Sequence, residues 1–460
     1  MKRVKGQIRP GTRASAIVLA AATMFAVVGC TPGGSQETVT EGSATSGTVN
    51  WWGWTPERGV GENYIKLFNE QYPDITVNYR QIAVQDYDSV LMPGLSSSVG
   101  PDVFNVAPGG GIGGVDRYAS FTTDMTPQLE SAFGSDWKAK IAQNGPVGLE
   151  TGDGIMAGLP VGSTFAGSLW INQDMFDKYN LQVPATYDEW VTTCQTLKTS
   201  GETCLALGAG DSGANMDFVH AIADSIEPGL WTKAVAGEAP WTSPSIIKAG
   251  EIFKEMFTNG IIQEGAQGMQ QYPDVNNRFM AGEAAMVLMG TWYMQYSTVP
   301  SMTAAVEASG SSTGELFPIV NIPLPAMGDP SNPAPLFGDV DYGLAVSTNA
   351  KNPQAATTFA TWLATSDEAQ QLVTDSLNNL PSLNELEPQW DQIELVDAQA
   401  QKDSLIELQQ RAVGVVEPRL GDITAELGEA IKVAVNGVAT GSVEPLDAFN
   451  ALQASADALR

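Results

Sequence analysis

Short apolar runs alternate with amphipathic stretches along the chain from residue 49 onward. Residues 49–52 predict a buried strand, and apolar side chains at helical spacing from Tyr64 to Tyr72 predict a helix that ends near Pro73. Residues 75–79 predict the next strand. A strand, a helix and a strand within about 30 residues make a βαβ unit, so the pattern predicts a parallel sheet in an α/β fold.

Further elements follow downstream. Residues 102–106 predict another strand, which leads into the glycine-rich segment 109–114. This segment lacks the spacing of a phosphate-binding loop, so we expect a flexible surface loop. Thr186 followed by Glu189 predicts a capping box at the start of a helix. The later segments predict a helix and a short strand over 278–289, a strand at 344–346, and helices from 353 and over 423–438.

Length and composition indicate a large folded protein. Hydrophobic residues make up 43% of the 460 residues and charged residues 16%, which is too apolar for a disordered polymer. The chain also exceeds the roughly 250–300 residues at which a single hydrophobic core stops growing. We therefore expect two lobes.

The N-terminus has the features of a bacterial export signal. Five basic residues and no acidic residue lie within 1–13, and an apolar run follows over 14–28. This run is shorter than the roughly 20 residues that a membrane-spanning helix needs. We therefore expect residues 1–29 to be a cleaved signal peptide.

The residue after the expected cleavage site is a cysteine. The motif VVGC, which ends at Cys30, resembles a lipobox, and this resemblance implies a lipid on Cys30; an ordinary secretory peptide is the alternative. Residues 30–48 are rich in Gly, Ser and Thr, which predicts a flexible tether between the lipid and the folded body.

The protein is strongly acidic. It has 52 Asp and Glu against 23 Lys and Arg, a net charge of −29, and loss of residues 1–29 leaves −34. Such a charge opposes binding to nucleic acid and to anionic lipid. Its single histidine, His220, excludes a metal centre that needs two imidazoles. We therefore expect no metal, no cofactor and no nucleic-acid partner, and a structural role for His220.

Two cysteines remain beyond Cys30. They are Cys194 and Cys204, separated by turn-forming residues. In an oxidising compartment such a pair predicts a local disulfide, and two buried thiols are the alternative. Since a CxxC redox motif is absent, we expect a structural pair.

Five segments resemble a known family. They are, in chain order, FNEQYPDITV, PDVFNV, DGIMAGLP with LWINQDMFDKYNL, VPATYDEW and RFMAGEAAMVLMGTW. From about residue 49 to its C-terminus the chain resembles the extracellular solute-binding proteins of ABC importers, specifically the carbohydrate-binding family that includes the maltose-binding proteins. The resemblance implies a type II periplasmic-binding-protein-like α/β fold with two lobes, each a sheet flanked by helices, joined by a multi-segment hinge. It implies one lobe of 49–163 with about 343–410, and a second of about 166–336 with 415–460.

The resemblance also implies a function. We expect a monomeric, non-enzymatic protein that is held by its lipid at the outer face of the bacterial cell membrane. It would capture a carbohydrate, an oligosaccharide, between its lobes and deliver it to ABC permease subunits. Sugars need flat aromatic surfaces and hydrogen-bond partners, and the 11 tryptophans are compatible with this use.

The family's ligand-binding loops map onto strand ends of this chain. The implied ligand contacts are Trp54, Thr55, Asn105, Thr164, Phe165, Asp211, Asn215, Trp292, Asp339 and Asp341. Trp292 matches the family's ligand-stacking aromatic through the helix, strand and GTW sequence around it. We assign Trp51, Trp52 and Trp170 to packing, and we keep Trp231 as an additional candidate.

Two other functions stay open. A surface glycoside hydrolase would use two carboxylates about 5–10 Å apart, and the many acidic residues allow this although no hydrolase motif is present. Alternatively, the same fold would bind a peptide, a polyamine or a metal. A metal receptor would normally need more than one histidine or a convergent group of carboxylates.

Overall fold

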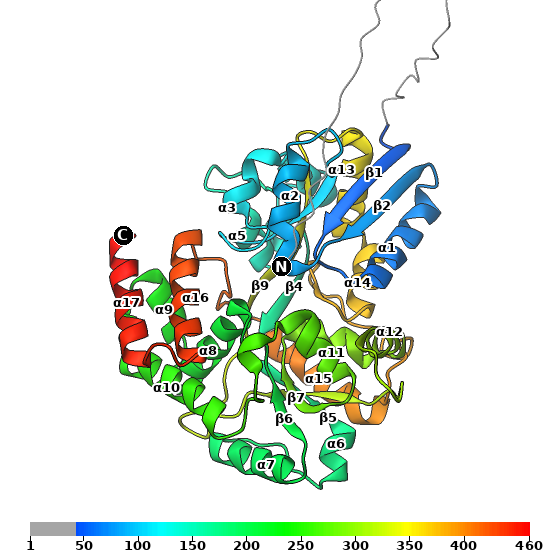
Figure 1. Ribbon diagram of the computed structural model, residues 1–460. Coiled ribbons are helices and arrows are strands. Elements are labelled where there is room, and N and C mark those ends of the chain that lie inside the picture. The colour runs from blue at the N-terminus through cyan, green and yellow to red at the C-terminus, as the bar shows by residue number, and fades with distance from the viewer. Residues whose placement is uncertain (1–42) are drawn as a thin grey trace, which may run out of the picture. The chain divides into compact units, whose positions relative to one another are not determined.

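The computed structural model describes residues 43–460, which lie in one compact unit (Figure 1). The predicted signal peptide 1–29, the predicted lipid site Cys30 and tether residues 30–42 lie outside the described residues. The end of the predicted tether is part of the fold, because Gly47 begins the first strand and Thr358 donates a hydrogen bond to the Ala44 carbonyl.

A six-stranded sheet contains the predicted βαβ unit. Its strand order is β10-β4-β9-β3-β1-β2. Strand β1 pairs in parallel with β2 and β3, whereas β9 runs antiparallel to β3 and β4. The strands are β1 Gly47–Gly53, β2 Ile75–Gln81, β3 Val103–Val106, β4 Leu159–Ala166, β9 Phe337–Val346 and β10 Leu380–Pro381. A strand from late in the chain, β9, therefore lies inside the sheet of the first elements.

A four-stranded sheet forms the second centre of the fold. Its order is β6-β7-β5-β8, with β6 and β7 parallel and β5 antiparallel to both of its neighbours. The strands are β5 Ser168–Asn172, β6 Thr203–Ala206, β7 Ala284–Leu288 and β8 Ile319–Pro323.

Helices flank both sheets. Those that pack with the six-stranded sheet are α1 Arg58–Gln71, α2 Tyr87–Leu95, α3 Val115–Tyr118, α4 Thr126–Phe133, α5 Asn144–Leu149, α13 Pro353–Thr365 and α14 Asp367–Asp375. Those that pack with the four-stranded sheet are α6 Gln173–Lys178, α7 Tyr187–Thr199, α8 Ser212–Ile226, α9 Leu230–Ala236, α10 Pro244–Thr258, α11 Asn276–Met280, α12 Val299–Ser309, α15 Ala398–Ala412, α16 Ala425–Ala439 and α17 Pro445–Ala458. In Figure 1 the final two helices, α16 and α17, lie side by side.

The period-two alternation of strand side chains divides the core. Leu169 and Ile171 of β5 join one hydrophobic cluster, whereas Trp170 between them joins another. Because successive strand side chains point to opposite faces, these clusters cover the two faces of the four-stranded sheet. Trp51 is fully buried in a third cluster around the six-stranded sheet, and Trp52 lies half-buried beneath Arg80.

Three connections pass between the sheets. The first is Gly167, which separates β4 from β5 and has φ +94°, a backbone conformation that favours glycine. The second joins β8 to β9, and the third leads from β10 to α15. Helix α15 packs against β8 of the four-stranded sheet, although the predicted boundary at 410 places it with the first lobe.

The glycine-rich segment 109–114 differs from its prediction. Instead of a surface loop it is mostly buried, and the Gly110 N–H donates to the Ile423 carbonyl at 3.3 Å. A Cβ atom at Gly110 would lie 2.4 Å from the Ala425 nitrogen. The glycines therefore allow a close backbone approach to the start of α16, which the sequence pattern alone did not reveal.

Thr186 is the N-cap of α7 as predicted, but Glu189 binds the N–H of the residue before the N-cap and not that of Thr186, so the predicted capping box is present in modified form. The Thr186 hydroxyl accepts a hydrogen bond from the Glu189 N–H, and the Glu189 carboxylate accepts one from the Ala185 N–H at 2.8 Å. The same helix carries Cys194, which forms a disulfide with Cys204 in the following strand region. These contacts hold the start of α7 and link its second half to β6.

We predict that Thr186→Ala lowers the free energy of unfolding by about 1 kcal/mol, because the helix loses its N-cap acceptor. Urea denaturation measures this difference. Thr192→Ala is the control, since Thr192 only donates to a carbonyl within the same helix. An equal decrease in the free energy of unfolding of both variants would contradict the role of Thr186 as the N-cap.

Candidate functional site

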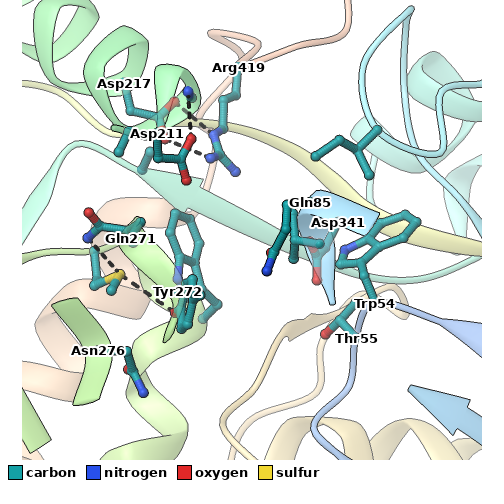
Figure 2. Close-up of a pocket in the computed structure, with 18 of the residues that line it drawn as sticks. Trp54, Thr55, Gln85, Asp211, Asp217, Gln271, Tyr272, Asn276, Asp341 and Arg419 are labelled. Carbon is teal, nitrogen blue, oxygen red and sulfur yellow. Dashed lines mark hydrogen bonds and ion pairs between the residues drawn. The ribbon is translucent and has the colours of Figure 1, made fainter. Parts of the chain in front are cut away.

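A cavity of about 550 Å³ lies where strand ends of both sheets meet. Trp54 and Thr55 follow β1, Asp341 belongs to β9, and Met289 follows β7. Figure 2 shows Trp54 and Thr55 across the cavity from Tyr272. A space of this size, lined by apolar surface with a few polar groups, is typical of a small-ligand site.

Three aromatic side chains line this cavity: Trp54, Tyr272 and Trp292. All three are half-buried. Trp54 packs edge-on against Tyr87 with ring centroids 4.8 Å apart, which holds the indole in place. Tyr272 lies in the irregular turn Gln271–Val275, and its hydroxyl contacts the sulfur of Met289 at 3.6 Å. The cavity thus offers flat apolar faces from separate chain segments.

Arg419 is the only guanidinium that the described residues place in the cavity wall. Its Nε and Nη2 atoms donate to the two carboxylate oxygens of Asp217, at 2.9 and 2.6 Å. The guanidinium also lies over the Trp292 ring, 4.9 Å from the centroid. Burial is the largest single effect and disfavours the charge, but the carboxylates of Asp217, Asp341 and Asp339 together outweigh it and raise the pKa of Arg419. The guanidinium therefore stays charged and is paired with Asp217.

Asp339 anchors the backbone around Arg419. One oxygen of this carboxylate accepts hydrogen bonds from the N–H groups of Arg419, Leu420 and Gly421, at 3.0, 2.6 and 3.2 Å. Because Asp339 lies on β9 and Asp217 on α8, the Arg419 segment ties one wall of the cavity to the other.

Two further carboxylates in the wall form no ion pair within residues 43–460, although the nearby charge of Arg419 favours the ionised form of both. Burial raises the pKa of Asp211, although its oxygen accepts the Gly213 N–H as the N-cap of α8. Burial likewise raises the pKa of Asp341 and outweighs the hydrogen bond from Asn379 at 2.8 Å. Both groups are strong acceptors whose ionised forms are incompletely compensated inside the protein.

Five of the ten residues predicted as ligand contacts line the cavity. They are Trp54, Thr55, Asp211, Trp292 and Asp341. They come from four separate regions of the chain, which the tertiary structure brings together around one space.

The other five predicted residues lie outside the lining, and each has another partner. Asn105 is buried and bridges the Trp51 Nε1–H and the Thr55 carbonyl. Asn215 is buried and donates to Ala209 and Asn436. The remaining three are Thr164, buried in β4 opposite Asp339, Phe165, buried in the core, and Asp339, which holds the backbone at 419–421.

Sequence reasoning did not select Arg419, Tyr272 or Gln271. Arg419 belongs to the irregular segment between α15 and α16, where no strand-end pattern marks it. Its residue type was a signal that could have found it, because basic residues are less than half as frequent as acidic ones in this chain. Gln271 is buried and holds the chain beside Tyr272, accepting the Gly208 N–H at 2.8 Å and donating to the Leu288 carbonyl at 3.0 Å.

His220 and Trp231 lie outside the cavity wall and are packed in the hydrophobic core. His220 is buried between Phe337 and Trp231, with ring centroids 3.7 and 5.1 Å away, and contacts Asp224 at 3.2 Å. Trp231 is buried in the same cluster and does not line the cavity. Within residues 43–460 no group of three or more His, Cys, Asp or Glu is arranged to hold a metal ion.

Comparison with known families decides the kind of protein. The family model described as "Bacterial extracellular solute-binding protein" matches residues 55–370, more than two thirds of the chain. The chain belongs to this family. An "uncharacterized ABC transporter extracellular-binding protein" of Pyrococcus horikoshii is 23% identical over 237 residues, 50% of this chain and 52% of that protein. The match thus spans about half the length of this curated relative.

Solved structures share the fold of this solute-binding protein at low identity. A structure from work on xylan utilization by Caldanaerobius polysaccharolyticus has a TM-score of 0.70 at 20% identity, covering 88% of this chain and 99% of the other. Maltose-bound MalE3 of T. maritima has a TM-score of 0.68 at 17% identity, covering 90% and 100%. The GacH receptor of Streptomyces glaucescens has a TM-score of 0.66 at 19% identity, covering 90% and 98%. The predicted type II binding-protein fold, with two helix-flanked sheets, is confirmed.

Family membership places this solute-binding protein outside the cytoplasm and among binding proteins. In the part of the chain that the structure describes, no helix combines the length and the apolarity needed to cross a membrane.

We predict that Asp341→Asn stabilises the ligand-free protein at pH 7. A carboxyl group whose pKa rises on folding stabilises the fold fully below its ordinary value of 3.8, and this stabilisation is lost as the pH rises through the raised pKa. Asparagine does not titrate, so the variant should gain stability relative to the wild type as the pH increases from 4 to 7. Thermal unfolding at several pH values measures this, and a parallel pH dependence in the two proteins would contradict it.

Proposed function

We propose that this solute-binding protein captures a carbohydrate, an oligosaccharide, in the cavity and delivers it to the permease subunits of an ABC importer. The observation that carries the proposal is the combination of three aromatic rings with carboxylate and amide groups around one space. Sugars present C–H faces that stack on aromatic rings and hydroxyls that need hydrogen-bond partners. The cavity provides both kinds of contact.

The descriptions of structures with the same fold support this choice. They name xylan utilization, bound maltose, and acarbose. Since those proteins are at most 20% identical to this chain, they support the class of ligand rather than a particular sugar. We infer binding without chemical conversion, because the family consists of binding proteins.

Ligand capture would involve movement of the two sheet-centred lobes, with the three connections between the sheets as hinge. The cavity is lined from both sheets, so closing it would add contacts from both walls to the same ligand. We further propose that the protein acts as a monomer, and that a lipid on Cys30 holds it at the outer face of the cell membrane.

Calorimetric titration with neutral di-, tri- and tetrasaccharides of several linkages tests the binding function. We expect at least one of them to bind with a dissociation constant in the micromolar range or below. Chromatography of the recovered sugar must show it intact, because hydrolysis would favour a glycoside hydrolase instead. Binding of only peptides or polyamines in a parallel thermal-shift screen would also contradict the proposal.

A separate experiment tests the anchor. Membrane fractionation of cells that express the full chain should find the wild type with the membrane and Cys30→Ser in the soluble fraction. Mass spectrometry of the mature N-terminus should detect a lipid on Cys30. An unmodified Cys30 in the membrane-associated wild type would contradict the anchor.

A further inference from the structure

The charged groups of the cavity wall point to the charge of the ligand. We propose that the cavity selects saccharides that carry a protonated amine and rejects saccharides that carry a carboxylate or a phosphate. This inference rests on the proposed carbohydrate-binding function and specifies its ligand class.

The first argument is the balance of charges around the cavity. The lining contains four carboxylates, Glu57, Asp211, Asp217 and Asp341, against the single guanidinium of Arg419. Arg419 is already bound through two hydrogen bonds to Asp217. The ion pairs found within residues 43–460 include none of the other three carboxylates. The wall therefore carries a net negative charge, and its one positive group is already paired with Asp217.

The second argument is the position of these carboxylates. Asp341 belongs to β9 and Asp211 caps α8, and Figure 2 shows them on different sides of the cavity. Burial raises the pKa of both groups, which means that each lacks a full compensating charge. A cation bound beside either carboxylate would supply that charge, whereas an anion would add to the repulsion. The net charge of −29 adds a field of the same sign at long range.

The third argument is a buried acceptor in the wall that has no donor. Gln295 lines the cavity and is only 4% exposed. Its Nε2 atom donates to the Trp292 carbonyl at 3.1 Å, but its Oε1 atom has no hydrogen-bond partner among the described residues. Carboxylates also only accept hydrogen bonds when ionised. An ammonium group brings three donors and no acceptor, so it matches this wall, while a carboxylate ligand brings acceptors alone.

The aromatic rings fit the same ligand class. The face of an indole or phenol ring attracts a cation. The guanidinium of Arg419 above Trp292 is an example within this cavity. Trp54 and Tyr272 offer further faces to a ligand. The rings can thus stack on a sugar ring and at the same time stabilise an attached ammonium group.

Matched ligands test the inference. A panel of neutral gluco-configured oligosaccharides in α-1,4 and β-1,4 linkage is titrated first, to find a skeleton that binds. Derivatives of that skeleton, or of every panel member if no neutral sugar binds, with one hydroxyl replaced by an amine or with one C6 oxidised to a carboxylate, are then compared at pH 6.5. We expect the amine to bind about tenfold more tightly than the neutral sugar and the carboxylate about tenfold more weakly.

Two variants make the test specific. Asp341→Asn should reduce the ratio of amine to neutral affinity by about tenfold. Asp136→Asn is the matched control, because it removes the same charge from an exposed position outside the cavity lining, and should leave that ratio unchanged. A skeleton that binds equally well in its neutral, amine and carboxylate forms overturns the charge inference and leaves the carbohydrate function standing. Failure of every neutral and charged sugar overturns both.

Discussion

Arg419→Ala is expected to lower the free energy of unfolding by about 3 kcal/mol, because it leaves Asp217 as a charge without its partner. The side chains of Arg419 and Asp217 are only 27% and 11% exposed. Water can therefore replace the lost guanidinium only in part, and the carboxylate keeps most of its desolvation penalty. Urea denaturation of the ligand-free protein measures the loss.

An exposed ion pair of the same kind is the control for Arg419. Arg117 pairs with Asp88 at 2.8 Å, but its side chain is 42% exposed. Arg117→Ala should therefore lose less than about 1 kcal/mol. The double variant Arg419→Ala/Asp217→Asn should recover part of the loss, because it also removes the uncompensated charge. If Arg419→Ala and Arg117→Ala lower the free energy of unfolding equally, the buried pair of Arg419 and Asp217 does not stabilise the fold more than an exposed pair.

Trp292→Ala is expected to weaken binding of the carbohydrate ligand by roughly 30- to 100-fold, about 2–3 kcal/mol. The indole is half-buried, lines the cavity and has a guanidinium 4.9 Å from its ring centroid. Removing it takes away both a stacking surface and the group that covers the Arg419 guanidinium. Calorimetry with the sugar identified for the wild type measures the change.

Trp52 provides the matched control for Trp292. It is also half-buried with a guanidinium over its ring, that of Arg80 at 4.5 Å, but it does not line the cavity. Trp52→Ala should keep the affinity of the folded protein within about twofold of the wild type, since its ring has no ligand contact. Affinity retained by Trp292→Ala would remove Trp292 from the binding site.

The expected destabilising effect of Asp341 is consistent with a role in ligand binding. Asp341 is expected to destabilise the ligand-free fold near neutral pH, and its proposed contribution is to ligand recognition. Binding sites often hold groups that a purely structural role would not retain. Asp341→Asn is predicted to raise the stability of the ligand-free protein and to lower its selectivity for amines, and both effects can be measured.

Local pattern determined a large part of the fold. The alternation at 49–52 and 75–79 and the helical spacing between them correctly predicted β1, α1 and β2, because each element buries a face with its own period. The capping residues Thr186 and Glu189 act within four residues of each other, so no distant contact is needed to predict them. The family's order of segments further predicted which strand ends would meet, and five of the ten named residues line the cavity.

Side-chain direction was decided by the tertiary structure. Asn105 lies at a strand end as predicted, yet its amide is used by Trp51 and by the Thr55 carbonyl. The glycines at 109–114 proved to be a close-packing surface, because α16 arrives there from more than 300 residues later in the chain. Such contacts depend on which distant segment fills the neighbouring space, and a local pattern does not contain that information.

The charges of the cavity show most clearly which properties follow from the sequence and which follow from the tertiary structure. The sequence by itself determined an acidic chain of alternating strands and helices, because composition and periodicity are properties of the chain alone. Only the tertiary structure decided that Arg419 pairs with Asp217, 202 positions away, and that Asp211 and Asp341 belong to no ion pair within residues 43–460. Pairing between charges depends on distance in space, and folding rather than chain order determines that distance.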